Sequence, residues 1–138
     1  KLRGRIDRID KANDGRVQVI DYKAGSKPIS LDEARQGSNM QMPVYALAAN
    51  QCIEPGAHVS SGIFLSISQA ISIGRIDFDK VGAELLPQVK EHIVNFVHGI
   101  EQGKFPVLPV DQKVCATCDH GMVCRIAELG KSDAYGEE

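Results

Sequence analysis

Two apolar β-type runs near the start of the chain, each carrying an aspartate toward its end, constrain the fold most strongly. Residues 2–10 form the first run and residues 16–23 the second, separated by the turn-prone Asn13-Asp14-Gly15. Apolar runs joined by an Asn/Asp-Gly turn are typical of a β-hairpin. We therefore expect the two runs to pair as antiparallel strands.

The middle of the chain predicts a helix followed by a second strand pair. Residues 27–38 are polar and predict a loop with a short helical turn. Residues 40–52 predict a helix with Pro43 in its first turn, where the missing N–H costs nothing. Residues 58–68 and 71–78 have the β-branched, apolar character of strands.

The second half predicts one long helix and an irregular tail. An apolar stripe at helical spacing runs from residue 79 to about residue 102, and we expect Asp79 to cap this helix and Pro87 to kink or delay it. The tail from Pro109 predicts one short helix over residues 122–129. The order β-β-α-β-β-α predicts an α/β fold with a mixed central β-sheet flanked by helices.

The size and composition indicate one globular domain. The chain has 138 residues, of which 43% are hydrophobic and 25% charged, and we expect residues 1–108 to form the core and residues 109–138 a tail of the same domain. Because the net charge is −2, any contact with nucleic acid must come from a local basic patch. No apolar run is long enough to span a bilayer, so no membrane partner is expected. The chain opens on Lys1 rather than methionine, and we expect it to be a piece of a longer protein.

The aspartates of the hairpin predict a metal site. Asp21 and Lys23 are two residues apart, so a strand directs both side chains to the same side, and Asp7 ends the preceding run. Mg²⁺ prefers oxygen ligands and typically binds one or two carboxylates. Asp7, Asp21 and the backbone carbonyl of Tyr22 are the candidate ligands, while Lys23 suits a phosphate oxygen. Asp10 is expected to lie on the opposite face, as a partner of Arg8 or a supporting residue.

Gln41 and Tyr45 form a second candidate group. They are four residues apart, so both project from one face at the start of the predicted helix, where amide and phenol donors suit a phosphate. The alternative is that Tyr45 packs in the core and Gln41 lies on the surface. Periodicity alone favours that alternative.

Three segments in order resemble a known family. They are Gly4-Arg5-Ile6-Asp7-Arg8-Ile9-Asp10, Ile20-Asp21-Tyr22-Lys23-Ala24-Gly25 and Gln41-Met42-Pro43-Val44-Tyr45. This pattern resembles the PD-(D/E)XK nuclease superfamily, and within it the RecB/AddB-type exonuclease domain of bacterial recombinational repair. The resemblance implies a restriction-endonuclease-like fold and a Mg²⁺- or Mn²⁺-dependent deoxyribonuclease that acts on linear DNA ends in the bacterial cytoplasm, together with a helicase or helicase-like partner.

The resemblance also implies roles for individual residues. Asp7 and Asp21 would hold the metal, Lys23 would be catalytic, and Gln41 and Tyr45 would support the active site or contact the DNA backbone. Arg5 and Arg8 on the first run could flank a DNA groove, although alternating charges on an edge strand would look the same. Family members carry an upstream helix that adds an acidic or histidine residue near the metal, and this chain begins after that point.

The cysteines of the tail predict a second metal site. Cys115, Cys118 and Cys124 lie within ten positions, and the CxxC pair is a common metal chelate. In iron–sulfur members of the family a similar trio joins one upstream cysteine to hold a [4Fe–4S] cluster, so the resemblance implies such a cluster in the full-length parent. Two alternatives stay open: a zinc site completed by His120, and a trio without metal. Cys52, at the end of an apolar helix, is a poor fourth ligand.

Two other functions compete with the nuclease hypothesis. The chain could be a non-catalytic DNA-binding or scaffolding module of the same fold, with the cysteine tail as a structural metal clip. It could also be a related nuclease of a CRISPR adaptation system, which shares the same cysteine pattern. Asp7, Asp21 and Lys23 are all present, and this favours the enzyme.

Overall fold

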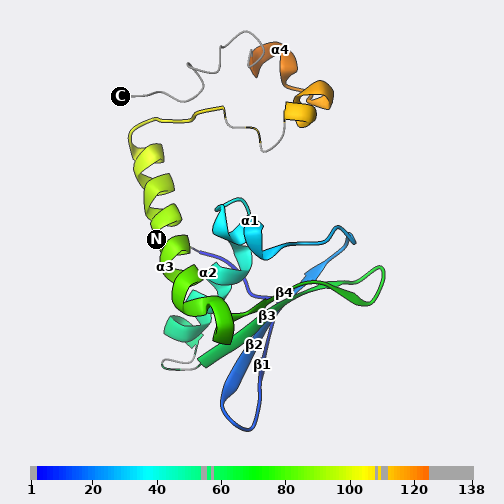
Figure 1. Ribbon diagram of the computed structural model, residues 1–138, viewed down its shortest axis with the longest axis vertical. Helices are drawn as coiled ribbons and strands as arrows, with labels where there is room; N and C mark the ends of the chain where they lie inside the picture. Colours follow the sequence, from blue (N-terminus) through cyan, green and yellow to red (C-terminus); the bar gives the residue numbers. More distant parts are fainter. Residues whose placement is uncertain (1–2, 54–55, 57, 108, 110–111, 125–138) are drawn as a thin grey trace. The chain divides into compact units, whose positions relative to one another are not determined.

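The chain divides into two compact units, Lys1–Val94 and Asn95–Glu138. The structure, a computed structural model, describes residues 3–53, 56, 58–107, 109 and 112–124. The first unit contains the whole sheet and the candidate site (Figure 1). The division expected from the sequence, a core of 1–108 and a tail of 109–138, stays a prediction.

The first unit is built on a four-stranded sheet with the spatial order β1-β2-β3-β4. Its strands are β1 (Arg8–Lys11), β2 (Arg16–Lys23), β3 (His58–Ser66) and β4 (Ile71–Asp77). The β1–β2 and β3–β4 pairs are antiparallel, whereas β2 and β3 are parallel. A parallel pair requires a crossover connection, and the segment between these strands supplies it with two helices (Figure 1). The predicted mixed sheet is confirmed.

The first hairpin forms as predicted, but its first strand is shorter than expected. Asp14 stabilises the turn, because its carboxylate accepts hydrogen bonds from the Arg16 backbone N–H at 3.1 Å and from Arg16 Nε at 2.7 Å. These bonds lower the pKa of Asp14. Strand β1 begins only at Arg8. The reason is that Asp7 Oδ2 accepts the Tyr22 N–H at 3.0 Å, so a side chain takes the donor that a longer ladder would have used.

Three helices of the first unit cover one face of the sheet (Figure 1). They are α1 (Leu31–Arg35), α2 (Gln41–Ala48) and the part of α3 (Phe78–Glu101) that ends at Val94. Helix α1 begins with a capping box between Ser30 and Glu33. Pro43 lies in the first turn of α2, as predicted. The helix predicted over 40–52 is not α-helical throughout, because α2 continues into a π-helical turn, η1 (Ala49–Ile53).

Helix α3 corrects two expectations. It begins at Phe78, so Asp79 lies inside the first turn, and its Oδ1 atom contacts His58 Nε2 at 2.5 Å instead of capping the helix. This pair joins the start of β3 to the start of α3. The helix also continues without a break through Pro87, whose side chain is exposed, so the predicted delay at this residue is wrong.

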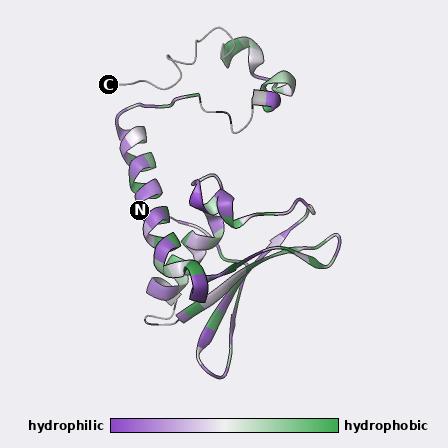
Figure 2. Ribbon diagram, viewed as in Figure 1, coloured by the Kyte–Doolittle hydropathy of each residue, from purple (hydrophilic) through white to green (hydrophobic). Residues whose placement is uncertain are grey.

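The core lies between the sheet and the three helices. Along the strands the ribbon alternates between hydrophobic and hydrophilic residues (Figure 2), and the apolar side chains on one face meet those of the helices in a single cluster. The fully buried members include Val19 of β2, Phe64 of β3, Met42 of α2, and Leu85 and Val89 of α3. This packing fixes the direction of β2, which carries the candidate site.

After the end of α3, the described part of the second unit contains two short helices. They are the 3₁₀-helix η2 (Gln112–Thr117) and α4 (Gly121–Cys124). Helix α4 overlaps the start of the helix predicted over 122–129, and the rest of that range lies outside the described residues. Across the described ranges, the helices are too short or too polar to traverse a lipid bilayer.

We predict that Gly62→Ala destabilises the protein because Gly62 of β3 faces the core. A methyl group here would lie 2.2 Å from Met42 Cγ and 2.4 Å from its sulfur, and Met42 is fully buried. Such overpacking costs about 1–3 kcal/mol of the free energy of unfolding, measurable by urea denaturation. Gly4→Ala is the matched control, since no atom of the described residues lies within 4 Å of its added Cβ. Equal midpoints for the two variants would contradict the described packing.

Candidate functional site

The polar cluster of the first unit forms where β2 ends. Asp21 and Lys23 lie within the last three positions of this strand and on the same side, as predicted. Asp21 is only 3% exposed, although it is ionisable, whereas the Lys23 side chain is about one-third exposed. Lys23 Nζ lies 2.8 Å from Asp21 Oδ2. A buried carboxylate beside an ammonium is the arrangement that a low-polarity environment requires.

Gln41 joins this pair to the first turn of α2. Its Oε1 atom accepts a hydrogen bond from Lys23 Nζ at 2.5 Å, and its Nε2 atom donates to Asp21 Oδ1 at 2.9 Å. Nε2 also donates to the Tyr45 hydroxyl at 3.0 Å. The amide of Gln41 therefore uses its acceptor and both donor directions. Four of the predicted site residues, Asp21, Lys23, Gln41 and Tyr45, form one connected network, so Gln41 is not a plain surface residue.

One oxygen of Asp21 is suited to a cation. Oδ2 is buried and, within the described residues, has no hydrogen bond of acceptable geometry. The Lys23 nitrogen is close enough for an ion pair, but its direction does not satisfy hydrogen-bond criteria. Since a buried acceptor without a hydrogen bond is costly, this oxygen fits a further cationic ligand. Hard cations such as Mg²⁺ prefer carboxylate oxygen.

Asp7 approaches the same end of β2 from the neighbouring strand segment. Asp7 directly precedes β1, whose ladder with β2 begins at the Arg8–Ile20 pair. One Asp7 oxygen is held by the Tyr22 N–H. The predicted role of the Tyr22 carbonyl as a metal ligand stays a prediction.

Of the basic residues predicted to contact DNA, Arg8 begins β1 and Arg5 lies three residues before it. Arg5 and Arg8 are both exposed. Arg8 Nε donates to Asp10 Oδ1 at 2.7 Å, which confirms the expected Arg8–Asp10 pair, and Arg8 also contacts the Tyr22 hydroxyl at 3.4 Å. These bonds raise the pKa of the Arg8 guanidinium. A mainly apolar groove of about 920 Å³ runs beside Asp7, Arg8 and Tyr45.

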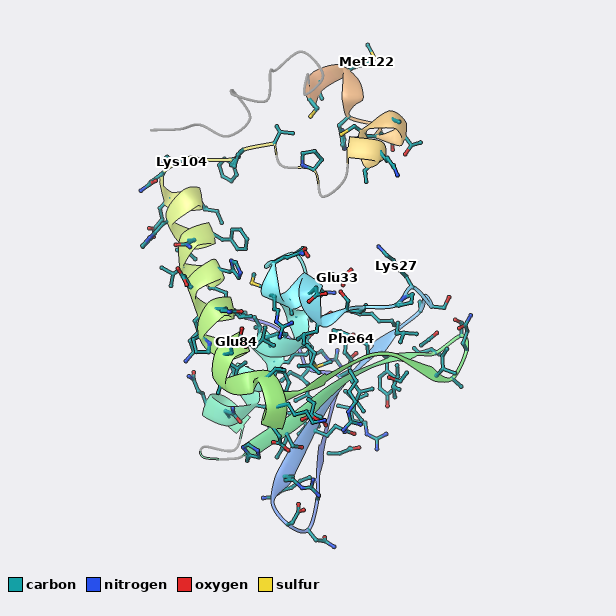
Figure 3. The ribbon with its side chains drawn as sticks, in the orientation of Figure 1. Lys27, Glu33, Phe64, Glu84, Lys104 and Met122 are labelled. Carbon is teal, nitrogen blue, oxygen red and sulfur yellow. The ribbon has the colours of Figure 1, made fainter. Side chains whose placement is uncertain are left out.

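The sequence did not indicate the role of Phe64. Strand β3 places this fully buried residue beside Asp21, and the Lys23 ammonium lies 5.4 Å from the centre of its ring. This distance permits a cation–π contact, which helps to orient the ammonium. Figure 3 shows Phe64 within the sheet. The only sequence signal was the apolar run of β3, which does not reveal the parallel register with β2.

The cysteine trio does not form a metal site in the described structure. Cys115 belongs to η2, Cys118 follows it, and Cys124 ends α4, and all three are free thiols. In the stretches of the chain that are described, no group of three or more His, Cys, Asp or Glu side chains is arranged to hold a metal ion. The predicted iron–sulfur and zinc alternatives therefore stay predictions. Cys52 lies in η1, and its side chain is outside the described residues.

Several bacterial proteins named as subunits of an ATP-dependent helicase/deoxyribonuclease are similar to this chain in sequence. The protein of Limosilactobacillus fermentum is 32% identical over 88% of this chain and 9% of its own length. The protein of Clostridium perfringens is 38% identical over 64% of this chain and 8% of its own length. The protein of Desulforudis audaxviator is 42% identical over 41% of this chain and 6% of its own length. The chain thus spans less than a tenth of these relatives. No solved structure matches it.

The family assignment rests on a match over most of the chain. The sequence profile of the PD-(D/E)XK nuclease superfamily matches residues 1–125. The mixed sheet with flanking helices agrees with the restriction-endonuclease-like fold expected for that family. The sequence resemblance is therefore confirmed: this chain belongs to the PD-(D/E)XK nuclease superfamily.

Proposed function

We propose that the chain is a metal-dependent DNA exonuclease domain that hydrolyses phosphodiester bonds at the end of β2. The observation that carries the proposal is the buried Asp21 carboxylate. It forms one network with Lys23 and Gln41, and among the residues that the structure describes its Oδ2 atom has no hydrogen-bond partner. A strand end that served only structure would not require a buried charge. The names of the relatives, which include deoxyribonuclease, support DNA as the substrate.

The proposed metal ligands are Asp7 and Asp21, with the Tyr22 carbonyl as a third candidate. When bound, Mg²⁺ or Mn²⁺ supplies Lewis-acid chemistry and lowers the pKa of a coordinated water. The chain supplies the remaining functions. Lys23 offers a positive charge for a phosphate oxygen, Gln41 fixes Lys23 and Asp21 in place, and Tyr45 holds the second amide hydrogen of Gln41. Arg5 and Arg8 are the proposed contacts to the DNA backbone.

The proposal extends to the longer protein. The names of the relatives include a helicase activity. We therefore propose that the parent acts on linear DNA ends together with a helicase partner or domain. The proposed process is recombinational repair in the bacterial cytoplasm. We also propose that Cys115, Cys118 and Cys124 bind a [4Fe–4S] cluster in that parent, with a fourth ligand from elsewhere. Zinc is the alternative for the same thiols.

We predict that substitutions of Lys23 and Asp21 have different effects on the affinity for metal. The Lys23 ammonium lies against the Asp21 oxygen that the metal would use. Lys23→Ala should therefore bind Mn²⁺ at least as tightly as the wild type, whereas Asp21→Asn should weaken binding about tenfold or more. Titration calorimetry with Mn²⁺ measures both. Asp10→Asn is the matched control, because Asp10 pairs with Arg8. Unchanged affinity in Asp21→Asn would contradict the assigned ligand.

We predict that cleavage depends on Lys23 even where metal binding does not. Removing one positioned charge from a transition state typically costs about 100-fold or more in kcat. Lys23→Ala should lose at least this much activity on linear DNA in Mg²⁺, measured as released nucleotides. The control is Lys80→Ala, since Lys80 is an exposed residue paired with Asp77. DNA binding without metal-dependent cleavage by the wild type would instead favour the non-catalytic module.

We predict that the cysteine trio acts as one unit. Anaerobic reconstitution of the parent with iron and sulfide should give a brown protein, and Cys118→Ser should lose that absorbance. Bound zinc instead of iron, measured by elemental analysis, would replace the cluster hypothesis with the zinc alternative. A wild-type protein that binds neither metal would contradict both.

A further inference from the structure

A small cavity opens beside Lys23, on the side of the loop that follows β2. We call it the lysine pocket, and its volume is about 280 Å³. Its lining includes Lys23, Lys27, Ile29, Glu33, Asn39 and Ile73. This volume lies near the lower end of the range of about 300–1,000 Å³ for small-ligand sites. The pocket therefore suits one small ligand, such as a single nucleotide, and not a duplex.

The wall of the lysine pocket is fixed by backbone contacts. The Ile29 N–H donates to the Ile73 carbonyl of β4 at 2.8 Å, which docks loop 24–30 onto the sheet. Gly74 permits this approach, because a Cβ atom there would lie 2.6 Å from the Ile29 carbonyl oxygen. The pocket is thus a built feature next to the proposed catalytic lysine.

The polar groups of the pocket are available to a ligand. In the part of the chain that the structure describes, the side chains of Lys27 and Asn39 form no hydrogen bond or ion pair. The Glu33 carboxylate makes one long contact, in which Oε2 accepts the Ser30 N–H at 3.4 Å. Figure 3 shows Lys27 on the loop and Glu33 on α1. The pocket thus offers the Lys27 ammonium, one carboxylate, one carboxamide and apolar lining residues, next to Lys23, whose ammonium is paired with Asp21.

This set of groups matches the parts of a nucleotide. A phosphate suits the two lysines, and the apolar faces of a sugar and base suit Ile29 and Ile73. A carboxylate accepts from the exocyclic amino group of a base, and a carboxamide both donates and accepts at a base edge. Thymine carries a carbonyl oxygen where cytosine carries its exocyclic amino group. The Glu33 carboxylate would therefore face a second acceptor there instead of a donor.

We propose that the lysine pocket binds one nucleotide next to the cleaved phosphate and prefers a base that carries an exocyclic amino group. This inference rests on the proposed nuclease function. It assigns Glu33 and Asn39 to substrate specificity and Lys27 to phosphate binding. All three lie in the range 27–38 or just beyond it, which the sequence indicated as a loop with a short helical turn.

The first test scans the substrate. A single abasic residue is placed in turn at each position around the cleaved bond of an oligonucleotide, and kcat and KM are measured. One position should raise KM about threefold to tenfold, the range expected from the loss of one or two hydrogen bonds, with little change in kcat. At that position cytosine should give a lower KM than thymine. Equal effects at all positions would overturn the proposal.

The second test changes the protein. Glu33→Gln keeps a residue that can complete the capping box, yet it should abolish the preference for cytosine over thymine. Asn39→Ala should raise KM without lowering kcat. The matched controls are Glu84→Gln and Asn13→Ala, at exposed positions far along the chain from the lining residues, and these should leave both parameters unchanged. Retained base preference in Glu33→Gln would contradict the assigned role of this carboxylate.

The third test does not depend on cleavage. Deoxycytidine monophosphate is titrated into the isotope-labelled protein, and the amide signals of Ile29 and Asn39 are followed by NMR, with thymidine monophosphate as the comparison. We expect shifts at these amides that are larger with the cytosine nucleotide. Such shifts in a protein that cleaves no DNA would support the pocket while refuting the nuclease proposal. Absent shifts in an active nuclease would refute the pocket alone.

Discussion

The ion pair between the buried Asp21 carboxylate and the Lys23 ammonium is the interaction on which the candidate site depends. Removing one partner of a buried pair typically costs about 3–5 kcal/mol, because the other charge remains without compensation. Here the partial exposure of Lys23 reduces that cost. The charge of the buried Asp21 carboxylate is compensated by this ammonium beside Oδ2 and by the Gln41 amide, which donates to Oδ1.

Features that depend on local periodicity were predictable from the sequence. Strand alternation placed Asp21 and Lys23 on one side, and helix spacing placed Gln41 beside Tyr45, before any contact was known. Periodicity could not show that Gln41 bridges two strand residues, because that contact joins α2 to β2 across the fold. The alternative favoured by periodicity was therefore wrong for Gln41, whereas Tyr45 does pack against the core as that alternative predicted.

Features that depend on distant segments were not predictable. The parallel register that brings Phe64 beside Asp21 is set by a crossover of more than thirty residues. Asp79 has the sequence position of a helix cap, yet its carboxylate contacts His58 of β3 instead. Gly74 gives no signal in the sequence, although its missing side chain lets the Ile29 loop dock on β4. In each case the local sequence does not specify which distant residue is contacted, and only the tertiary structure determines that contact.

The charge balance of the site provides a physical reason for metal dependence. Asp7, Asp21 and Lys23 together carry an excess of one negative charge. A phosphodiester, itself an anion, would be repelled by this surface in the absence of another cation. A divalent ion beside the two carboxylates reverses the sign of the local charge. Lys23, which also lines the lysine pocket, would then no longer be the main counterion of Asp21 and would be available to the phosphate.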